Sequence, residues 1–99
     1  MDLAALTAKA NEALQSGAFD KIVKFDFGDM GKLLLNGKEN VATNEDGDAD
    51  ATVKVDWEDF QKLLAGNLDP TMAFMQGKLK VMGDMSVAMQ LQSLFSQLK

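Results

Sequence analysis

Four residue types are missing from this sequence, which contains no cysteine, histidine, arginine or tyrosine. Without cysteine and histidine there can be no disulfide, no thiolate or imidazole metal site, and no Ser-His or Cys-His catalytic pair. Only Asp, Glu and Lys remain for acid–base chemistry, and nearly every acidic residue stands where a turn or a helix start explains it. We therefore expect a protein that is not an enzyme, with no catalytic residue, no cofactor and no metal site.

Basic residues are also few, since ten lysines stand against fifteen acidic residues and the net charge is −5. A negatively charged protein is repelled by the phosphate backbone, so nucleic acid is not an expected partner. The negative charge also disfavours strong docking on anionic lipid, which leaves transient membrane contact at most.

Long hydrophobic runs are absent as well. No window approaches the roughly 18 consecutive apolar residues of a membrane span, and residues 1–6 lack the basic start of a secretory signal. A chain of 99 residues with 46% hydrophobic content can bury one small core. We expect residues 1–99 to form a single domain with a cytoplasmic location.

The acidic segment 44–50 is similar in composition to a calcium-binding loop, but its spacing is wrong. If Gly47 took the invariant glycine position of an EF-hand, the first and last ligand positions would fall on Ala42 and Val53. Neither side chain can coordinate a cation. A solvated loop between strands is the expected structure.

Hydrophobic periodicity predicts a helix followed by strands in the first half. Asp2 can cap a helix that ends before Gly17. Its apolar stripe is Leu3, Leu6, Ala10, Ala13 and Leu14. From residue 21 the period becomes two, which places Val23, Phe25 and Phe27 on one face of a strand.

Glycine-containing turns separate the predicted strands. Gly28-Asp29 fits a two-residue hairpin loop, and Asn36-Gly37 fits the next turn. The strand between them, residues 30–36, should bury Leu33 and Leu35 while Leu34 makes its other face less polar than usual. Three further strands bring the predicted number to five. They are residues 39–43, where the alternation is weak, residues 51–55, where it is clearer, and residues 78–82.

Capping residues divide the second half into three further helices. Asp56 can cap a helix that buries Phe60, Leu63 and Leu64 and ends at Gly66. A short helix starts at Asp69-Pro70 and ends at Gly77, and Asp84 can start the last one. We predict an α+β fold, an antiparallel-rich five-stranded sheet covered on one face by about four helices.

The last predicted helix has no charged residue between Asp84 and Lys99. One interpretation is a core helix whose outer face is mildly polar. The other is a helix that also lines an apolar cavity or contacts a partner. The chain also contains seven methionines, which are either ordinary core filler or flexible side chains that can repack around ligands of varied shape. Five of the seven methionines are Met72, Met75, Met82, Met85 and Met89.

The C-terminal half resembles the sterol carrier protein 2 family. The most specific match is the motif Phe-Met-Gln-Gly-Lys-Leu-Lys-Val-Met-Gly-Asp-Met at residues 74–85. Matching residues upstream are Asp59, Phe60, Leu63, Gly66, Leu68, Pro70, Ala73 and Phe74. The resemblance implies an apolar tunnel between the sheet and the helices that accepts fatty acids, fatty acyl-CoA, sterols or other lipids.

Carried onto this sequence, the resemblance implies a set of ligand-binding residues. These are Phe60, Leu63, Leu64, Phe74, Met75, Gln76, Met82, Met85, Met89 and Leu91. Gln76 is the one polar member, and its amide either orients a lipid head group or caps the turn. Lys78 and Lys80 either contact a carboxylate or a CoA phosphate or are simply solvated.

We therefore expect non-catalytic lipid binding and transfer. On this hypothesis a charged residue in place of Met85 or Met89 weakens lipid binding more than folding. The alternative is a docking module, in which the uncharged last helix contacts another protein or a second copy to form a homodimer. Such a module would be an accessory subunit in lipid or quinone metabolism.

Overall fold

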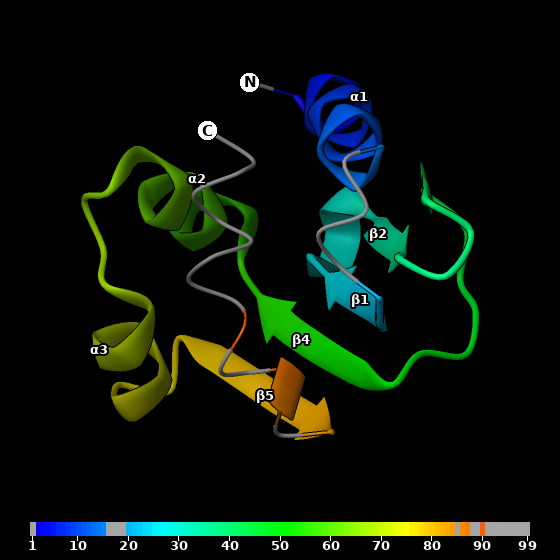
Figure 1. Ribbon diagram of the computed structural model, residues 1–99. Helices are drawn as coiled ribbons and strands as arrows, with labels where there is room; N and C mark the ends of the chain where they lie inside the picture. Colours follow the sequence, from blue (N-terminus) through cyan, green and yellow to red (C-terminus); the bar gives the residue numbers. More distant parts are fainter. Residues whose placement is uncertain (1, 16–19, 85, 88–89, 91–99) are drawn as a thin grey trace.

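The computed structural model describes residues 2–15, 20–84, 86–87 and 90, and within them five strands form one sheet (Figure 1). The elements in chain order are α1 (Leu3–Leu14), β1 (Ile22–Asp26), the 3₁₀ turn η1 (Gly28–Met30), β2 (Lys32–Asn36), β3 (Val41–Thr43), β4 (Ala51–Val55), α2 (Trp57–Ala65), α3 (Pro70–Met75) and β5 (Leu79–Gly83). In Figure 1, α1 and α2 lie above the sheet and α3 lies beside the start of β5. The predicted α+β fold class is confirmed.

The strand order is β3-β2-β1-β4-β5, and β1 and β4 are the one parallel pair among the described strands. The pairs β1–β2, β2–β3 and β4–β5 are antiparallel. A parallel pair needs a crossover connection, which residues 44–50 provide between β3 and β4. The sheet is thus antiparallel-rich, as the sequence predicts.

Alternation along the strands determines which side chains enter the core. On β1, Val23 and Phe25 are fully buried, and Phe25 stands opposite Leu33 on β2 and Val53 on β4. The predicted inward positions are therefore confirmed. The buried residues of the five strands are Val23, Phe25, Leu33, Leu35, Ala42, Ala51, Val53, Val55 and Leu79.

The crossover segment 44–50 lies across the opposite, outer face of the sheet. The Lys24 ammonium on that face donates to Oδ1 of Asp46 at 2.7 Å. A Cβ placed on Gly47 would lie 3.2 Å from the Leu34 side chain. The crossover therefore covers Leu34, which explains how an apolar residue is accommodated on the outer face.

Helix ends follow the predicted capping chemistry. Oδ1 of Asp2 accepts a hydrogen bond from the Ala5 amide at 2.8 Å and so caps α1. Asp69 accepts from the amides of Thr71 and Met72 at the start of α3. Asp56 stands at the N-cap position of α2 but makes no side-chain cap hydrogen bond. Two glycines with positive φ, Gly66 (80°) and Gly77 (77°), follow α2 and α3.

The predicted two-residue hairpin loop at Gly28-Asp29 is wrong. Strand β1 ends at Asp26 and β2 begins at Lys32, with η1 between them. The physical reason is a local side-chain contact, since Oδ1 of Asp26 accepts from the Gly28 amide at 2.9 Å and starts a turn. The Phe27 amide then donates to the Gly31 carbonyl at 3.0 Å and closes the wider loop.

The predicted fourth helix lies largely outside the described residues. Asp84 is at its expected start, where Oδ1 accepts from the amide of Ser86 at 2.9 Å and from its hydroxyl at 2.7 Å. Ser86, Val87 and Gln90 are helical. The described part of the chain thus holds three α-helices, and none of them is long and apolar enough to cross a membrane.

Candidate functional site

An aromatic cluster joins β1 to α2 on the inner face of the sheet. The ring of Phe60 meets the ring of Phe25 edge-on at a centroid distance of 5.2 Å, and that of Phe27 at 4.9 Å. Trp57 extends the cluster, with its ring 5.1 Å from that of Phe27. Phe60 is fully buried and Trp57 is half-buried, so the cluster runs from the core to the surface.

Three of the predicted ligand-binding residues belong to this inner region. Phe60, Leu63 and Leu64 are all buried in the core on α2. Their spacing of three and four residues places them on one helical face. The structure brings them together against the sheet.

Four other predicted residues lie at the surface. Phe74 and Met75 on α3 are exposed, with Met75 at 76% of its full accessibility. Gln76 follows α3 and is also exposed, and its backbone amide donates to the Met72 carbonyl at 2.9 Å. Met82 is exposed on β5 opposite Thr52. The remaining three, Met85, Met89 and Leu91, lie outside the described residues.

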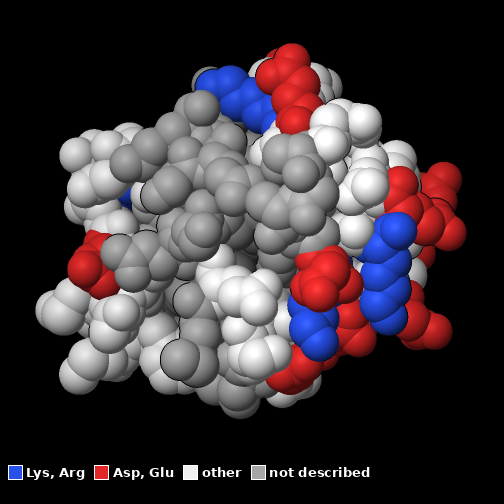
Figure 2. Space-filling model, in the orientation of Figure 1, with Lys and Arg blue, Asp and Glu red and all other residues white. Residues whose placement is uncertain are grey.

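An exposed apolar patch on α3 is therefore a feature that sequence reasoning missed. We call Met72, Phe74 and Met75 the α3 patch; they are 49%, 47% and 76% exposed. Ala73 is the one fully buried residue of α3. In Figure 2 the surface at the lower left, where α3 lies, is largely white, with acidic atoms at its upper edge. The signal in the sequence is a six-residue helix with one small residue among large apolar ones.

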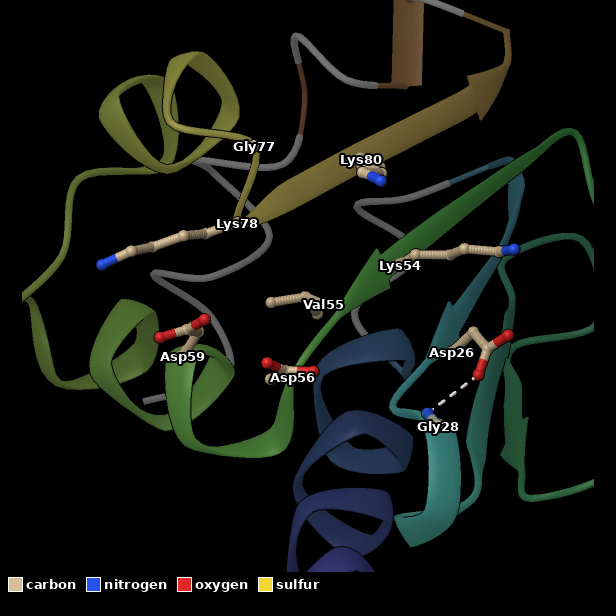
Figure 3. Close-up of a pocket in the computed structure, with 9 residues that line it drawn as sticks. All are labelled: Asp26, Gly28, Lys54, Val55, Asp56, Asp59, Gly77, Lys78 and Lys80. Atoms are coloured by element: carbon tan, nitrogen blue, oxygen red, sulfur yellow. Dashed lines mark hydrogen bonds between the residues drawn. The ribbon is translucent and has the colours of Figure 1, made fainter.

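A cleft of about 530 Å³ begins at the turn after α3 (Figure 3). It is lined by Asp26, Gly28, Lys54, Val55, Asp56, Asp59, Gly77, Lys78 and Lys80. Three lysines and three aspartates balance each other in charge. Lys54 and Lys80 stand directly opposite each other on β4 and β5, a like-charge pair.

A second cleft, of about 420 Å³, opens where the aromatic cluster reaches the surface. Its lining residues are Phe27, Gly28, Asp29, Met30, Asp56, Trp57, Glu58 and Asp59. Four carboxylates surround one indole ring, so this cleft is acidic. Within the part of the chain that the structure describes, no group of three ligating side chains could hold a metal ion.

Two carboxyl groups of the described residues, those of Asp46 and Asp84, have a pKa below its ordinary value. A hydrogen bond from Lys24, helped by its charge, lowers the pKa of Asp46 below its ordinary value. Hydrogen bonds from the hydroxyl and the amide of Ser86 lower the pKa of Asp84. A general acid requires the opposite shift, so neither carboxyl is tuned for acid catalysis.

Comparison with known proteins gives one consistent family. The model of the SCP-2 sterol transfer family matches residues 2–96. Human sterol carrier protein 2 is 48% identical over 61 residues, which make up 62% of this chain and 11% of that protein. Hydroxysteroid dehydrogenase-like protein 2 of Xenopus tropicalis is 44% identical over 66 residues, 66% of this chain and 16% of that protein.

The curated relatives are much longer than this chain, which spans only 16% and 11% of the two named here. Among solved structures, sterol carrier protein 2 from Aedes aegypti in complex with the C16 fatty acid palmitate superposes with a TM-score of 0.80. The two sequences are 22% identical, and the match covers 100% of both chains. This likeness shows a shared fold.

Proposed function

The chain belongs to the SCP-2 sterol transfer family, and we propose that it takes a lipid out of water and carries it without covalent chemistry. The observation that carries the proposal is the family match over residues 2–96. The fold supports it, because the buried apolar residues of the sheet and of α2 belong to one core, and an acyl chain held between these two layers would need apolar surface on both sides.

The proposed cargo class is fatty acids, fatty acyl-CoA or sterol-like lipids. Palmitate is the ligand of the Aedes aegypti structure, and a chain of that kind suits burial between sheet and helices. Each buried methylene contributes about 0.8 kcal/mol, so ten give about 8 kcal/mol before ordering costs. The expected affinity is therefore about micromolar or weaker, which lets a carrier release its cargo.

We assign the walls of the site to the buried face of α2 and the entrance to α3. Phe60, Leu63 and Leu64 supply apolar surface next to the sheet. Phe74 and Met75 stand exposed at the end of α3, where an incoming chain meets them first. The exposed Gln76 amide is the proposed contact for a polar head group.

The test is native mass spectrometry of the gently purified protein, followed by organic extraction. A stoichiometric mass of a fatty acid, an acyl-CoA or a sterol-like lipid is the expected result. Titration with a fluorescent fatty acid then measures the affinity directly. An empty protein that also ignores the fluorescent fatty acid would overturn the proposal. A lipid-free dimer in light scattering would instead support the docking module.

A further inference from the structure

We infer that α3 and the turn after it form the surface with which this protein docks on an anionic lipid bilayer. Lipid carriage requires exchange of cargo with membranes, so the inference adds to the proposed function the place where exchange occurs. Docking itself is measured without cargo. A failure of the docking inference can therefore be distinguished from a failure of the proposed lipid-carrier function.

The apolar half of this surface is the α3 patch. Its three members account for half of the six exposed large hydrophobic side chains in the described residues. They project from a helix held by the buried Ala73, which leaves most of the helix circumference outside. Apolar side chains gathered on one short helix can enter the interface between head groups and acyl chains.

The charged half of the surface is the pair Lys78 and Lys80. Both are exposed, and Lys78 follows the last residue of α3, Met75, by only three positions. The ion pairs in the described part of the chain join Lys21 to Asp84 and Lys24 to Asp46, so neither of these two lysines is neutralised at close range. In Figure 3 the Lys78 side chain runs below α3, on the side of the cleft where Asp59 lies. Three aspartates line the same cleft, but Lys78 and Lys80 are the charged residues of the turn and strand that follow α3, and cations beside an apolar protrusion complement anionic head groups.

The size of the patch favours a bilayer over a second copy of the chain. Three partly exposed side chains offer on the order of 300 Å² of apolar surface, whereas a stable protein interface needs about 800 Å² from each partner. Insertion into a membrane interface has no such minimum. Its strength grows with buried apolar area and with nearby positive charge.

The experiment compares cosedimentation of cargo-free protein with two kinds of vesicle, phosphatidylcholine alone and phosphatidylcholine mixed with phosphatidylglycerol. The wild type should bind the mixed vesicles more tightly. Met72→Glu should weaken binding to both kinds about tenfold. Lys78→Gln combined with Lys80→Gln should weaken binding about tenfold to the mixed vesicles only.

Met30→Glu is the matched control, because Met30 is 46% exposed and lies on η1 rather than on α3. It introduces the same carboxylate at a comparably exposed methionine, and it should leave vesicle binding within about twofold. A wild type that ignores both vesicles, or equal losses in Met30→Glu and Met72→Glu, would overturn the inference. A wild-type dimer that Met72→Glu dissociates would assign the patch to a second copy instead.

A second measurement reports insertion directly. Phe74→Trp in a Trp57→Phe background places the only indole of the chain on α3. On mixed vesicles its fluorescence should shift to the blue, and brominated lipid should quench it. An indole that remains in water while the protein sediments with the vesicles would contradict docking through α3. Fatty acid binding, measured separately on the wild type without vesicles, tests the proposed function alone.

Discussion

The side-chain amide of Asn11 on α1 binds both the amide and the carbonyl of Ala42 on the edge strand β3. Oδ1 of Asn11 accepts from the Ala42 amide at 2.7 Å, and Nδ2 donates to the Ala42 carbonyl at 3.1 Å. An edge strand otherwise presents unpaired backbone groups that can pair with another chain. A single side chain of α1 thus satisfies both backbone groups of Ala42 at this edge of the sheet.

Two further polar residues extend the contact along the same face of α1. Thr7 exchanges a hydrogen bond with Asn44, whose Nδ2 lies 3.0 Å from the threonine hydroxyl. One turn beyond Asn11, Nε2 of Gln15 donates to the Asn40 carbonyl at 3.3 Å. Residues four apart share one side of a helix, so Thr7, Asn11 and Gln15 form a polar row beside β3.

Replacing Asn11 with leucine should therefore destabilise the fold by about 2–3 kcal/mol, because two part-buried backbone groups lose their partners. Urea unfolding followed by circular dichroism measures the change. Gln15→Leu is the control and should cost less than about 1 kcal/mol, since it removes one exposed hydrogen bond. Equal losses in the two variants would show that Asn11 has no special role at the edge.

Gly83→Ala should be among the costliest small substitutions in the described residues. The φ angle of Gly83 is 104°, and an added Cβ would lie 2.5 Å from the carbonyl oxygen of Asp50 and 3.0 Å from Cα of Ala51. Backbone must move to relieve such a contact. We expect a loss of about 3 kcal/mol or more in thermal or urea unfolding.

Gly28→Ala separates conformational strain from the clash. The φ angle of Gly28 is 70°, and nothing lies within 4 Å of an added Cβ. Its expected cost is only the strain of a positive φ, about 1–2 kcal/mol. If Gly83→Ala and Gly28→Ala lost the same stability, the loss in Gly83→Ala would not come from the close approach of β5 to residues 50–51.

The contact between Lys24 and Asp46 predicts a specific pH dependence. Because a hydrogen bond from Lys24 lowers the pKa of Asp46, this carboxyl stabilises the folded state above its unfolded pKa. The contribution is lost as the pH falls through the lowered folded value. Lys24→Met should raise the pKa of Asp46 toward the ordinary range, measured by NMR titration of the carboxyl carbon.

Asp84 is the internal control for that titration. Its pKa is lowered chiefly by the hydroxyl and amide of Ser86 and only secondarily by Lys21. Lys24→Met should leave it unchanged. A parallel rise in both carboxyls would indicate a general change in the fold, and an unchanged pKa for Asp46 would remove Lys24 as the cause.

Local patterns in the sequence predict most of the elements but not the pairings that depend on distant contacts. The period of two along residues 21–27 and the caps at Asp2 and Asp69 are confirmed because they arise from neighbours in sequence. The parallel pairing of β1 with β4 joins residues about thirty positions apart and leaves no local signal. The turn after Asp26 depends on one side-chain oxygen that competes with a tighter hairpin.

The candidate site divides in the same way. The helical spacing of Phe60, Leu63 and Leu64 predicts their buried face, which the structure confirms. The exposure of Phe74 and Met75 could not be predicted, because apolar residues in a short helix are expected to be buried and only the tertiary arrangement leaves them outside. Their part in ligand binding stays a prediction.

Gln76 offers the sharpest test of how a head group is held. Its backbone amide donates the last hydrogen bond of α3, to the Met72 carbonyl. A role in binding a head group must therefore come from the exposed side-chain amide. An amide donor strengthens with the charge of its acceptor. Gln76→Ala should therefore weaken palmitate binding about fivefold, for a hydrogen bond worth about 1 kcal/mol, and leave the binding of palmitate methyl ester nearly unchanged.

Competition with a fluorescent fatty acid measures both ligands on the same protein. Gln61→Ala on α2 is the matched control, since it removes the same amide away from the turn after α3, and it should affect neither ligand. If Gln76→Ala weakened acid and ester alike, the turn rather than the amide would be responsible. The ratio of the two affinities thus separates a contact with the carboxylate from a change in the shape of the entrance.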